Sequence, residues 1–228
     1  MRSLEQDPII EEYHNFINNK AFPCIGAKSA MTKQQLKCMV AGHMACPNDD
    51  RTILKFLYDF IGEYRNSTKL FHSAAVIFKL PVIHNEEMFE GLLWQRLQML
   101  SDLDAEKYSH DKRVSNDPDN SLFGFSLKEE ALFIVALHPA SSRLARQFKY
   151  PALVFNPHAQ FETLRETDRY EHLKVIIRKR DQEYSGSVNP MLEDFGESSE
   201  VYQYSGHKYD KQWQCPFKPN HGPGKHNS

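Results

Sequence analysis

The chain has no long apolar run, no paired cysteine motif and little net charge, and each shortage excludes a class of protein. Without an extended hydrophobic stretch, a membrane-spanning helix is not expected. The first residues, MRSLEQDPIIEEYHNF, lack the apolar core of a signal peptide, which predicts a cytoplasmic protein. Acidic and basic residues are interleaved to a formal net charge of −2, so neither nucleic acid nor a membrane is an expected partner.

The four cysteines include no CxxC pair, which in a reducing compartment favours free thiols or metal ligands over disulfides. Cys38, His43 and Cys46 lie close together in the stretch CMVAGHMAC and resemble part of a zinc site. A structural zinc would need a fourth ligand and usually has tighter spacing. A zinc-stabilised binding module is therefore one alternative for this chain.

Hydrophobic and charged residues make up 40% and 25% of the 228-residue chain, as in an ordinary globular domain. No repeat or linker divides it, which predicts one domain over residues 1–217 and a disordered Gly/Pro-rich tail over 218–228. Periodicity predicts an α+β fold with a small mixed or antiparallel sheet flanked by helices. The expected helices are 3–19, one from near 28, 48–64, 85–100, 141–148 and 160–184, and the expected strands are 72–78, 122–127, 131–139 and 152–157, with loops at 101–120 and 185–206.

Two of these strands end with a histidine next to a proline: one ends in His138-Pro139 and the other in Pro157-His158. If the strands are neighbours, both histidines reach a sheet edge, where pockets often form. Arg143 and Arg146 follow the first histidine and Arg165 the second. An imidazole can ligate a metal and guanidinium groups can bind anions, a combination suited to a cofactor with a metal and carboxylates. Alternatively, each histidine simply caps a helix or bonds a loop carbonyl.

Cysteines and a polar loop give further candidates. Cys24, beside a glycine in FPCIGA, could approach a planar ligand as a thiolate, and Cys215 lies in WQCPF. A buried cysteine is more often an inert small hydrophobe. The loop SEVYQYSG places Glu200 and Tyr204 together, where they can line a substrate pocket or serve only as turn residues.

Several motifs occur together in one order: FPCIGAKSA, LHPASSRLARQF, FNPHAQFETLR, IRKRD, NPMLEDFG, SEVYQYSG and WQCPF. From about Phe22 to Phe217 the chain resembles the YqcI/YcgG-type family. That family includes heme-dependent N-hydroxylases of arginine and other guanidino compounds, in natural-product pathways such as those of guanitoxin and D-cycloserine. The resemblance implies a heme-dependent oxygenase that N-hydroxylates a small amine- or guanidine-bearing substrate.

The resemblance also suggests roles for the candidates. For the iron ligand the order is His158, His138, Cys24 and Cys215, because a proline fixes the approach of His158 and an apolar strand precedes it; a thiolate would favour O–O cleavage. Arg143, Arg146 and Arg165 would hold heme propionates or a substrate carboxylate. Glu200 or Asp194 would receive a guanidinium, with Tyr204 nearby. Implied partners are O2 or peroxide, an electron-donor protein and a second copy of the chain in a homodimer.

Two positions depart from the family pattern. His207 stands where an arginine is expected, and Thr167-Asp168 stand where a glycine is common. If the arginine contacts a propionate or a substrate acid, His207 would weaken the contact or make it depend on pH. A heme-binding sensor or carrier without turnover is the other alternative, and it would use two protein ligands such as His158 and His138.

Overall fold

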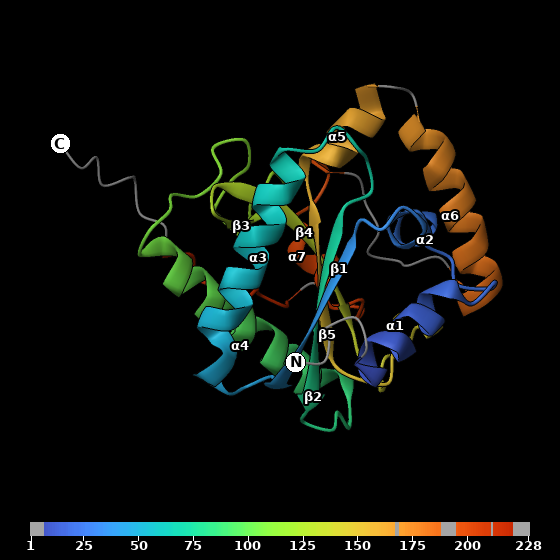
Figure 1. The fold of residues 1–228 in the computed structure, drawn as a ribbon, viewed down its shortest axis with the longest axis horizontal. Coiled ribbons are helices and arrows are strands. Elements are labelled where there is room, and N and C mark those ends of the chain that lie inside the picture. The colour runs from blue at the N-terminus through green and yellow to red at the C-terminus, as the bar shows by residue number, and fades with distance from the viewer. Residues whose placement is uncertain (1–6, 167–168, 188–194, 211, 221–228) are drawn as a thin grey trace.

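Figure 1 shows the protein in a computed structural model, in which residues 7–166, 169–187, 195–210 and 212–220 are described. Helices and strands alternate irregularly along the chain. In order, they are α1 (Pro8–Asn18), α2 (Ile25–Thr32), β1 (Leu36–His43), η2 (Pro47–Asp49), α3 (Asp50–Arg65), β2 (Ser73–Leu80), α4 (Glu86–Ala105), β3 (Phe125–Leu127), β4 (Glu130–Leu137), η3 (Leu144–Arg146), β5 (Ala152–Pro157), α5 (Ala159–Glu166), α6 (Arg169–Ser185) and α7 (Val201–Tyr204).

The five strands form one mixed sheet in the order β1-β2-β5-β4-β3. Only β1 and β2 are parallel, whereas β2, β5, β4 and β3 pair antiparallel. A two-residue turn at Lys128 and Glu129, both with positive φ, joins β3 to β4. Two positive φ values are the geometry of a type I′ hairpin turn. The predicted α+β fold with a small mixed sheet is confirmed.

Each strand alternates its side chains between two apolar layers, as the pleat of a sheet requires. One face, defined here as the α3/α4 face, buries Val76, Ile134 and Phe155 against α3 and α4. The opposite face, the α1/α2 face, carries Ile77 and Val154 and packs on α1 and α2. In Figure 1, α3 and α4 lie on one side of the sheet, and α1, α2 and α6 lie on the other.

Several predicted boundaries are wrong. Helix α2 begins at Ile25, three residues before the expected start, because the Cys24 sulfur accepts a hydrogen bond from Ala27 N and caps it. The 101–120 loop begins later, since α4 continues to Ala105. The helix expected at 141–148 is one 3₁₀ turn. Strand β1 and the short helix α7 were not predicted.

The C-terminal residues also depart in part from expectation. Lys218 exchanges two hydrogen bonds of 2.8 Å with the side chain of Gln98, and Asn220 Nδ2 donates to Asp102 Oδ1 at 2.7 Å. Both partners lie on α4. Residues 218–220 are thus attached to the domain, whereas 221–228 lie outside the described residues.

Candidate functional site

A cavity of about 330 Å³ lies on the α1/α2 face of the sheet, between the strands and the helices α2, α5 and α6. Its volume lies at the lower end of the range for ligand pockets. Apolar and aromatic side chains form most of its wall, and a few polar groups enter it. The polar residues include Cys24, Arg143, Arg146, Asn156, His158, Gln160, Arg165, Lys174, Asp181 and Glu200, and the apolar ones Tyr13, Phe22, Phe71, Phe133, Val135, Leu137, Val154, Phe161 and Phe195.

His158 reaches this cavity because β5 ends at Pro157, directly before it. Its backbone N–H donates to Ala131 O at 2.8 Å, which continues the ladder between β5 and β4 by one residue. The ring is 6% exposed and meets Phe195 edge-on at 4.4 Å. The strand end, the ladder bond and the ring contact therefore fix the imidazole in the cavity wall.

Glu200 and Tyr204 form a buried chain behind His158. The Nε2 atom of His158 lies 2.8 Å from Glu200 Oε1, and Tyr204 donates from its hydroxyl to Glu200 Oε2 at 3.2 Å. The backbone N–H of Phe125 in turn donates to the Tyr204 hydroxyl. Burial raises the pKa of the Glu200 carboxyl, while its bonds to His158 and Tyr204 oppose that rise. An ionised Glu200 carboxylate can only accept, so in that state Nε2 is the donor of this hydrogen bond.

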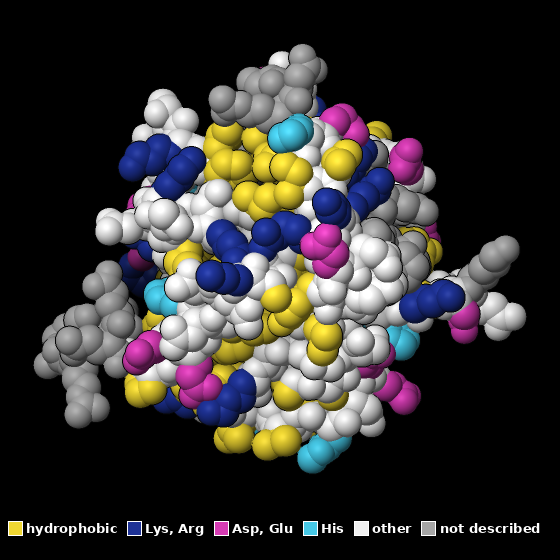
Figure 2. Space-filling model, turned by 90° about the vertical axis from the view of Figure 1, so that its right-hand side faces the viewer, with side chains coloured by type: hydrophobic (Ala, Val, Ile, Leu, Met, Phe, Trp, Pro, Cys, Tyr) yellow, Lys and Arg dark blue, Asp and Glu magenta, His cyan; other side chains and the backbone are white. Residues whose placement is uncertain are grey.

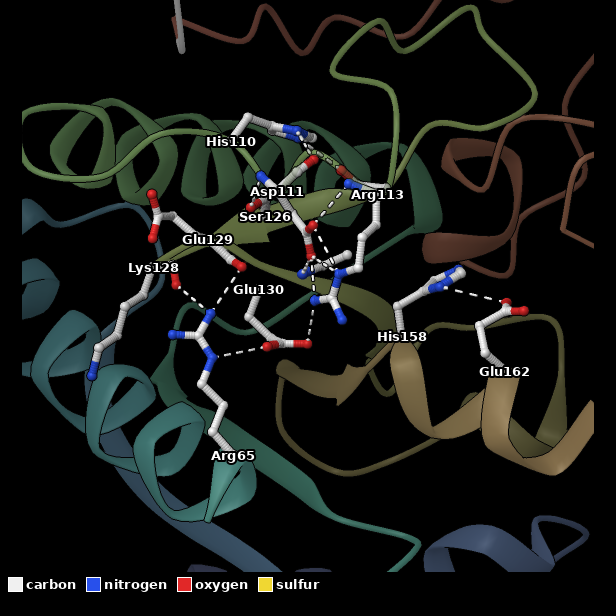
Figure 3. A network of polar contacts seen from close by, with 12 residues as sticks. Arg65, His110, Asp111, Arg113, Ser126, Lys128, Glu129, Glu130, His158 and Glu162 are labelled. Carbon is white, nitrogen blue, oxygen red and sulfur yellow. Dashed lines mark hydrogen bonds and ion pairs between the residues drawn. The ribbon is translucent and has the colours of Figure 1, made fainter. Parts of the chain in front are cut away.

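Figure 3 shows the polar network that anchors the neighbouring β3–β4 hairpin. Arg113 bonds to Asp111 and to Glu130, and Arg65 bonds to the other oxygen of Glu130 at 3.0 Å. Asp111 Oδ2 accepts from Ala131 N at 2.8 Å, the residue whose carbonyl receives the His158 N–H. The network thus holds the strand end on which His158 rests. In the same view the free side of the His158 ring faces Glu162, with Nδ1 3.9 Å from its Oε1.

The second predicted ligand, His138, lies elsewhere. Strands β4 and β5 are neighbours, as expected, but they are antiparallel, with Leu137 opposite Ala152 and Leu132 opposite Pro157. The two histidines therefore follow opposite ends of the strand pair, and because His158 is level with Ala131, seven strand positions separate them, roughly 23 Å. His138 stacks on Phe89 of α4 at 4.1 Å, outside the cavity lining. The pair cannot ligate one iron in this fold.

Of the cysteines offered as ligands, only Cys24 lines the cavity. Burial raises the pKa of its thiol, which favours the neutral form over the thiolate that binds a metal. Cys215 packs against the α3/α4 core, and burial raises its pKa to about 12. The structure therefore places the fourth-ranked candidate away from the site and leaves Cys24 as a protonated helix cap.

All three predicted arginines line the cavity, and each already has protein partners. Arg143 pairs with Asp181 at 2.5 Å and donates to Ser187 O at 3.0 Å. Arg146 donates to the carbonyls of Ala136, Gln203 and Tyr204, so it joins β4 to α7. Arg165 pairs with Glu162 and lies over the Tyr170 ring at 4.4 Å. Arg165, at the surface, is the arginine best placed to meet an anionic group.

None of the remaining predicted residues is seen to line the cavity: one supports Glu200 from behind, one lies elsewhere, and the others lie outside the described residues. Tyr204 is fully buried and supports Glu200 instead of lining the cavity. His207 bonds through Nδ1 to Glu86 Oε2 at 2.7 Å, away from the lining. Asp194 and Thr167-Asp168 lie outside the described residues.

Several lining residues were not predicted as site residues, among them Phe71 and Asp181. Phe71 has a φ of 72°, a left-handed conformation that is strained for an aromatic residue and is typical of functional sites. Its ring packs close to Gly26, where an added Cβ would lie 3.6 Å from Phe71 Cδ1. Nothing in the local sequence signals that conformation. Asp181 follows Arg180 in the sequence, but its carboxylate forms an ion pair with Arg143, which is distant in the sequence.

Metal binding through several protein side chains finds no support in the described part of the chain. There, no three His, Cys, Asp or Glu side chains are grouped as a metal ion would require. Cys38 lies on β1 beside His14, at 3.8 Å from Nε2, whereas His43 ends the strand and accepts from Ala45 N. The three residues of the predicted zinc site are therefore not brought together.

A single imidazole in an apolar wall is a different donor set, and its chemistry is that of one protein ligand to a cofactor metal. Histidines that ligate metals usually give their second ring nitrogen to a carboxylate, which is the relation of His158 to Glu200. Phenylalanine and aliphatic side chains supply apolar walls, and Arg165 and Lys174 are cations among the lining residues. His158 would hold the iron through Nδ1, since Nε2 is engaged.

Comparison with known proteins places the chain in a family. Residues 13–218 match the YqcI/YcgG family. The chain belongs to the YqcI/YcgG family. It is 30% identical over 219 residues to the "Uncharacterized protein YqcI" of Bacillus subtilis (strain 168), covering 89% of this chain and 85% of the relative. No solved structure matches the chain. The family match thus confirms the resemblance drawn from the motifs.

Helix length adds one further observation. Within the described ranges of this YqcI/YcgG family member, every helix is too short or too polar to cross a bilayer. This agrees with the lack of a long apolar run in the sequence.

Proposed function

We propose that the protein is a heme-dependent monooxygenase that N-hydroxylates a small amine- or guanidine-bearing substrate, such as arginine or a derivative. The observation that carries the proposal is His158, fixed in an apolar cavity with a buried carboxylate behind it. The family membership supports it. The proposal places the enzyme in the cytoplasm, with O2 or peroxide as co-substrate.

When bound, heme would supply the oxygen chemistry, and the chain supplies ligation, positioning and exclusion of water. Glu200 holds the His158 ring by one nitrogen and so fixes which nitrogen faces a ligand. Tyr204 holds Glu200 through its second oxygen. The aromatic wall, with Leu173 and Ile177 of α6, lines the cavity with apolar side chains, which would limit the access of water to a bound cofactor. Arg165 and Lys174 would bind carboxylates of the cofactor or of the substrate.

The first test is reconstitution with hemin, followed by the Soret absorbance. We expect stoichiometric uptake by the wild-type chain and a lost or altered Soret band in His158→Ala. His138→Ala and Cys24→Ser serve as matched controls and should bind hemin as the wild type does. Added imidazole should restore the band in His158→Ala, which separates loss of a ligand from loss of the fold. Failure of the wild type to bind hemin would refute the proposal.

A second test addresses Glu200 as a positioning residue. In Glu200→Gln the His158 ring keeps a hydrogen-bonding partner but loses the carboxylate charge. We expect hemin to bind, the iron reduction potential to rise and activity to fall about 10- to 100-fold, the usual cost of losing such a partner. Redox titration measures the reduction potential, and mass-spectrometric detection of oxygen incorporation measures the activity. An unchanged potential would mean that Glu200 has only a structural role.

A further inference from the structure

One surface beside the cavity is strongly basic, although the whole chain has a net charge of −2. Residues 13–48 contain four lysines and neither Asp nor Glu. This segment forms the second half of α1, the helix α2 and the strand β1. A stretch of that length without a carboxylate is unusual in a chain that has 30 Asp and Glu against 28 Lys and Arg.

Helix α6 adds cations to the same surface. Its residue Arg180 donates to the carbonyls of Lys20 and Phe22 at 2.6 and 3.0 Å, which joins α6 to the loop between α1 and α2. Burial, and then the nearby charge of Arg180, lower the pKa of the Lys28 ammonium. Lys28 and Arg180 are thus close enough to repel each other. We define the basic face as Lys20, Lys28, Lys33, Lys179 and Arg180.

Three carboxylates near the basic face already have cationic partners, whereas Glu183, four residues after Lys179 on α6, is exposed. Asp181 pairs with Arg143, Glu171 with Lys174 at 2.8 Å, and Glu63 with Lys37 at 2.9 Å. Figure 2 shows a band of Lys and Arg side chains crossing the middle of this side of the molecule, with few Asp and Glu among them. The positive potential of the face is therefore only partly compensated from within the chain.

The basic face also borders the cavity. Lys33 Nζ lies 5.2 Å from the centre of the Phe71 ring, and Phe71 lines the cavity. Lys174 and Ile177 of α6 line it from the other side. A partner bound to the basic face would therefore stand next to any group held in the cavity.

We propose that the basic face is the docking surface of an acidic one-electron carrier protein. The inference rests on the proposed function, because a monooxygenase that uses O2 needs electrons from outside. The five cations come from three adjoining segments, the α1–α2 loop, α2 with its C-terminal cap, and α6, which is more positive charge than a small anion requires. A chain with a sequence pI of about 6.6 is a poor candidate for nucleic acid, whose binding domains are usually strongly basic. Transient electron-transfer complexes are small and steered by opposite charges.

The test compares two double variants of the full-length protein with equal change in charge. Lys20→Glu/Lys179→Glu reverses two exposed cations of the basic face. Arg51→Glu/Lys107→Glu reverses two exposed cations at α3 and just after α4, on the other side of the sheet (Figure 1). Binding of a plant-type ferredoxin and of a flavodoxin, both acidic carriers, is measured by surface plasmon resonance. Basic cytochrome c is the negative control.

We expect the acidic carriers to bind at about 20 mM ionic strength and to weaken strongly near 200 mM, where surface charges are screened. The basic-face variant should raise their Kd about 10- to 100-fold at low salt. The control variant should change it less than about threefold. Equal effects of the two variants, or no salt-dependent binding, would overturn the inference. So would a basic-face variant that weakens binding of free arginine or citrate but not of the carriers.

Binding is measured without hemin and without turnover, so it stands apart from the reconstitution test. Carrier binding together with failure to bind hemin would refute the proposed function and, with it, the electron-transfer role of the basic face. Hemin uptake without carrier binding would overturn only the docking surface.

Discussion

At the scale of single residues, the buried imidazole of His138 is expected to control part of the acid sensitivity of the fold. His138 is 1% exposed, stacks on Phe89, and its Nδ1 atom has no hydrogen-bonding partner among the described residues. Burial lowers its pKa to about 4, whereas a histidine of the unfolded chain titrates near 6.5. Between these values the unfolded chain binds more protons, so the free energy of unfolding falls as pH falls.

Replacing His138 by Phe keeps the ring stack and removes the titration. The wild type should lose about 2 kcal/mol of stability through this residue between pH 7 and pH 4.5. His138→Phe should lose correspondingly less, and His84→Gln, an exposed control, should behave as the wild type. Urea unfolding at the two pH values measures the difference. If both variants show the wild-type pH dependence, His138 is not the responsible group.

At the scale of elements, α6 is held mainly at its C-terminal end. Asp181 is the one buried residue among those described in α6, and the inner side chains of the helix border the cavity instead of a packed core. Asp181 pairs with the buried Arg143, and Arg180 bonds to the α1–α2 loop. Few buried contacts and a terminal anchor are the features of a segment that opens locally.

Asp181→Asn should release α6 without unfolding the sheet. An uncompensated Arg143 is costly while buried, and opening of α6 allows water to reach it. We expect amide exchange in α6 to accelerate at least about tenfold, an effect of about 1.4 kcal/mol, with β2, β4 and β5 nearly unchanged. Glu183→Gln, exposed on the same helix, is the control. Equal acceleration in the sheet would show that the ion pair stabilises the whole domain.

Local patterns in the sequence were sufficient to predict those elements that have a clear hydrophobic period or a capping residue. Helix α3 and the start of α4 were predicted correctly, and Asn85 caps α4 by accepting from Met88 N at 2.7 Å. Strand β1 was missed because it is an edge strand with only partial burial, so its side chains do not alternate clearly. Pairing direction has no local signal, since two strands with the same ending can run parallel or antiparallel. The separation of His138 from His158 could therefore be learned only from the fold.

At the scale of the whole molecule, the two faces of the sheet differ in how completely they are filled. The α3/α4 face is closely packed, and Val76 on β2 is fully buried in it. The α1/α2 face encloses the cavity, and Val154 on the neighbouring strand β5 lines its wall. Removing the same atoms from each side therefore has different consequences, because one site is already bordered by empty space.

Val76→Ala and Val154→Ala make a matched pair for this asymmetry. Val76→Ala loses the transfer energy of two methyl groups and leaves a new void, at about 2 to 3 kcal/mol. Val154→Ala only enlarges an existing cavity, so about 1 kcal/mol or less is expected without ligand. Urea unfolding of both variants measures the difference. A ligand stabilises the folded protein according to its affinity, and hemin in the cavity would contact Val154. In the presence of hemin, Val154→Ala should therefore lose more free energy of unfolding, relative to the wild type, than Val76→Ala loses. Equal losses in both variants, with and without hemin, would show that the cavity wall is as tightly packed as the core.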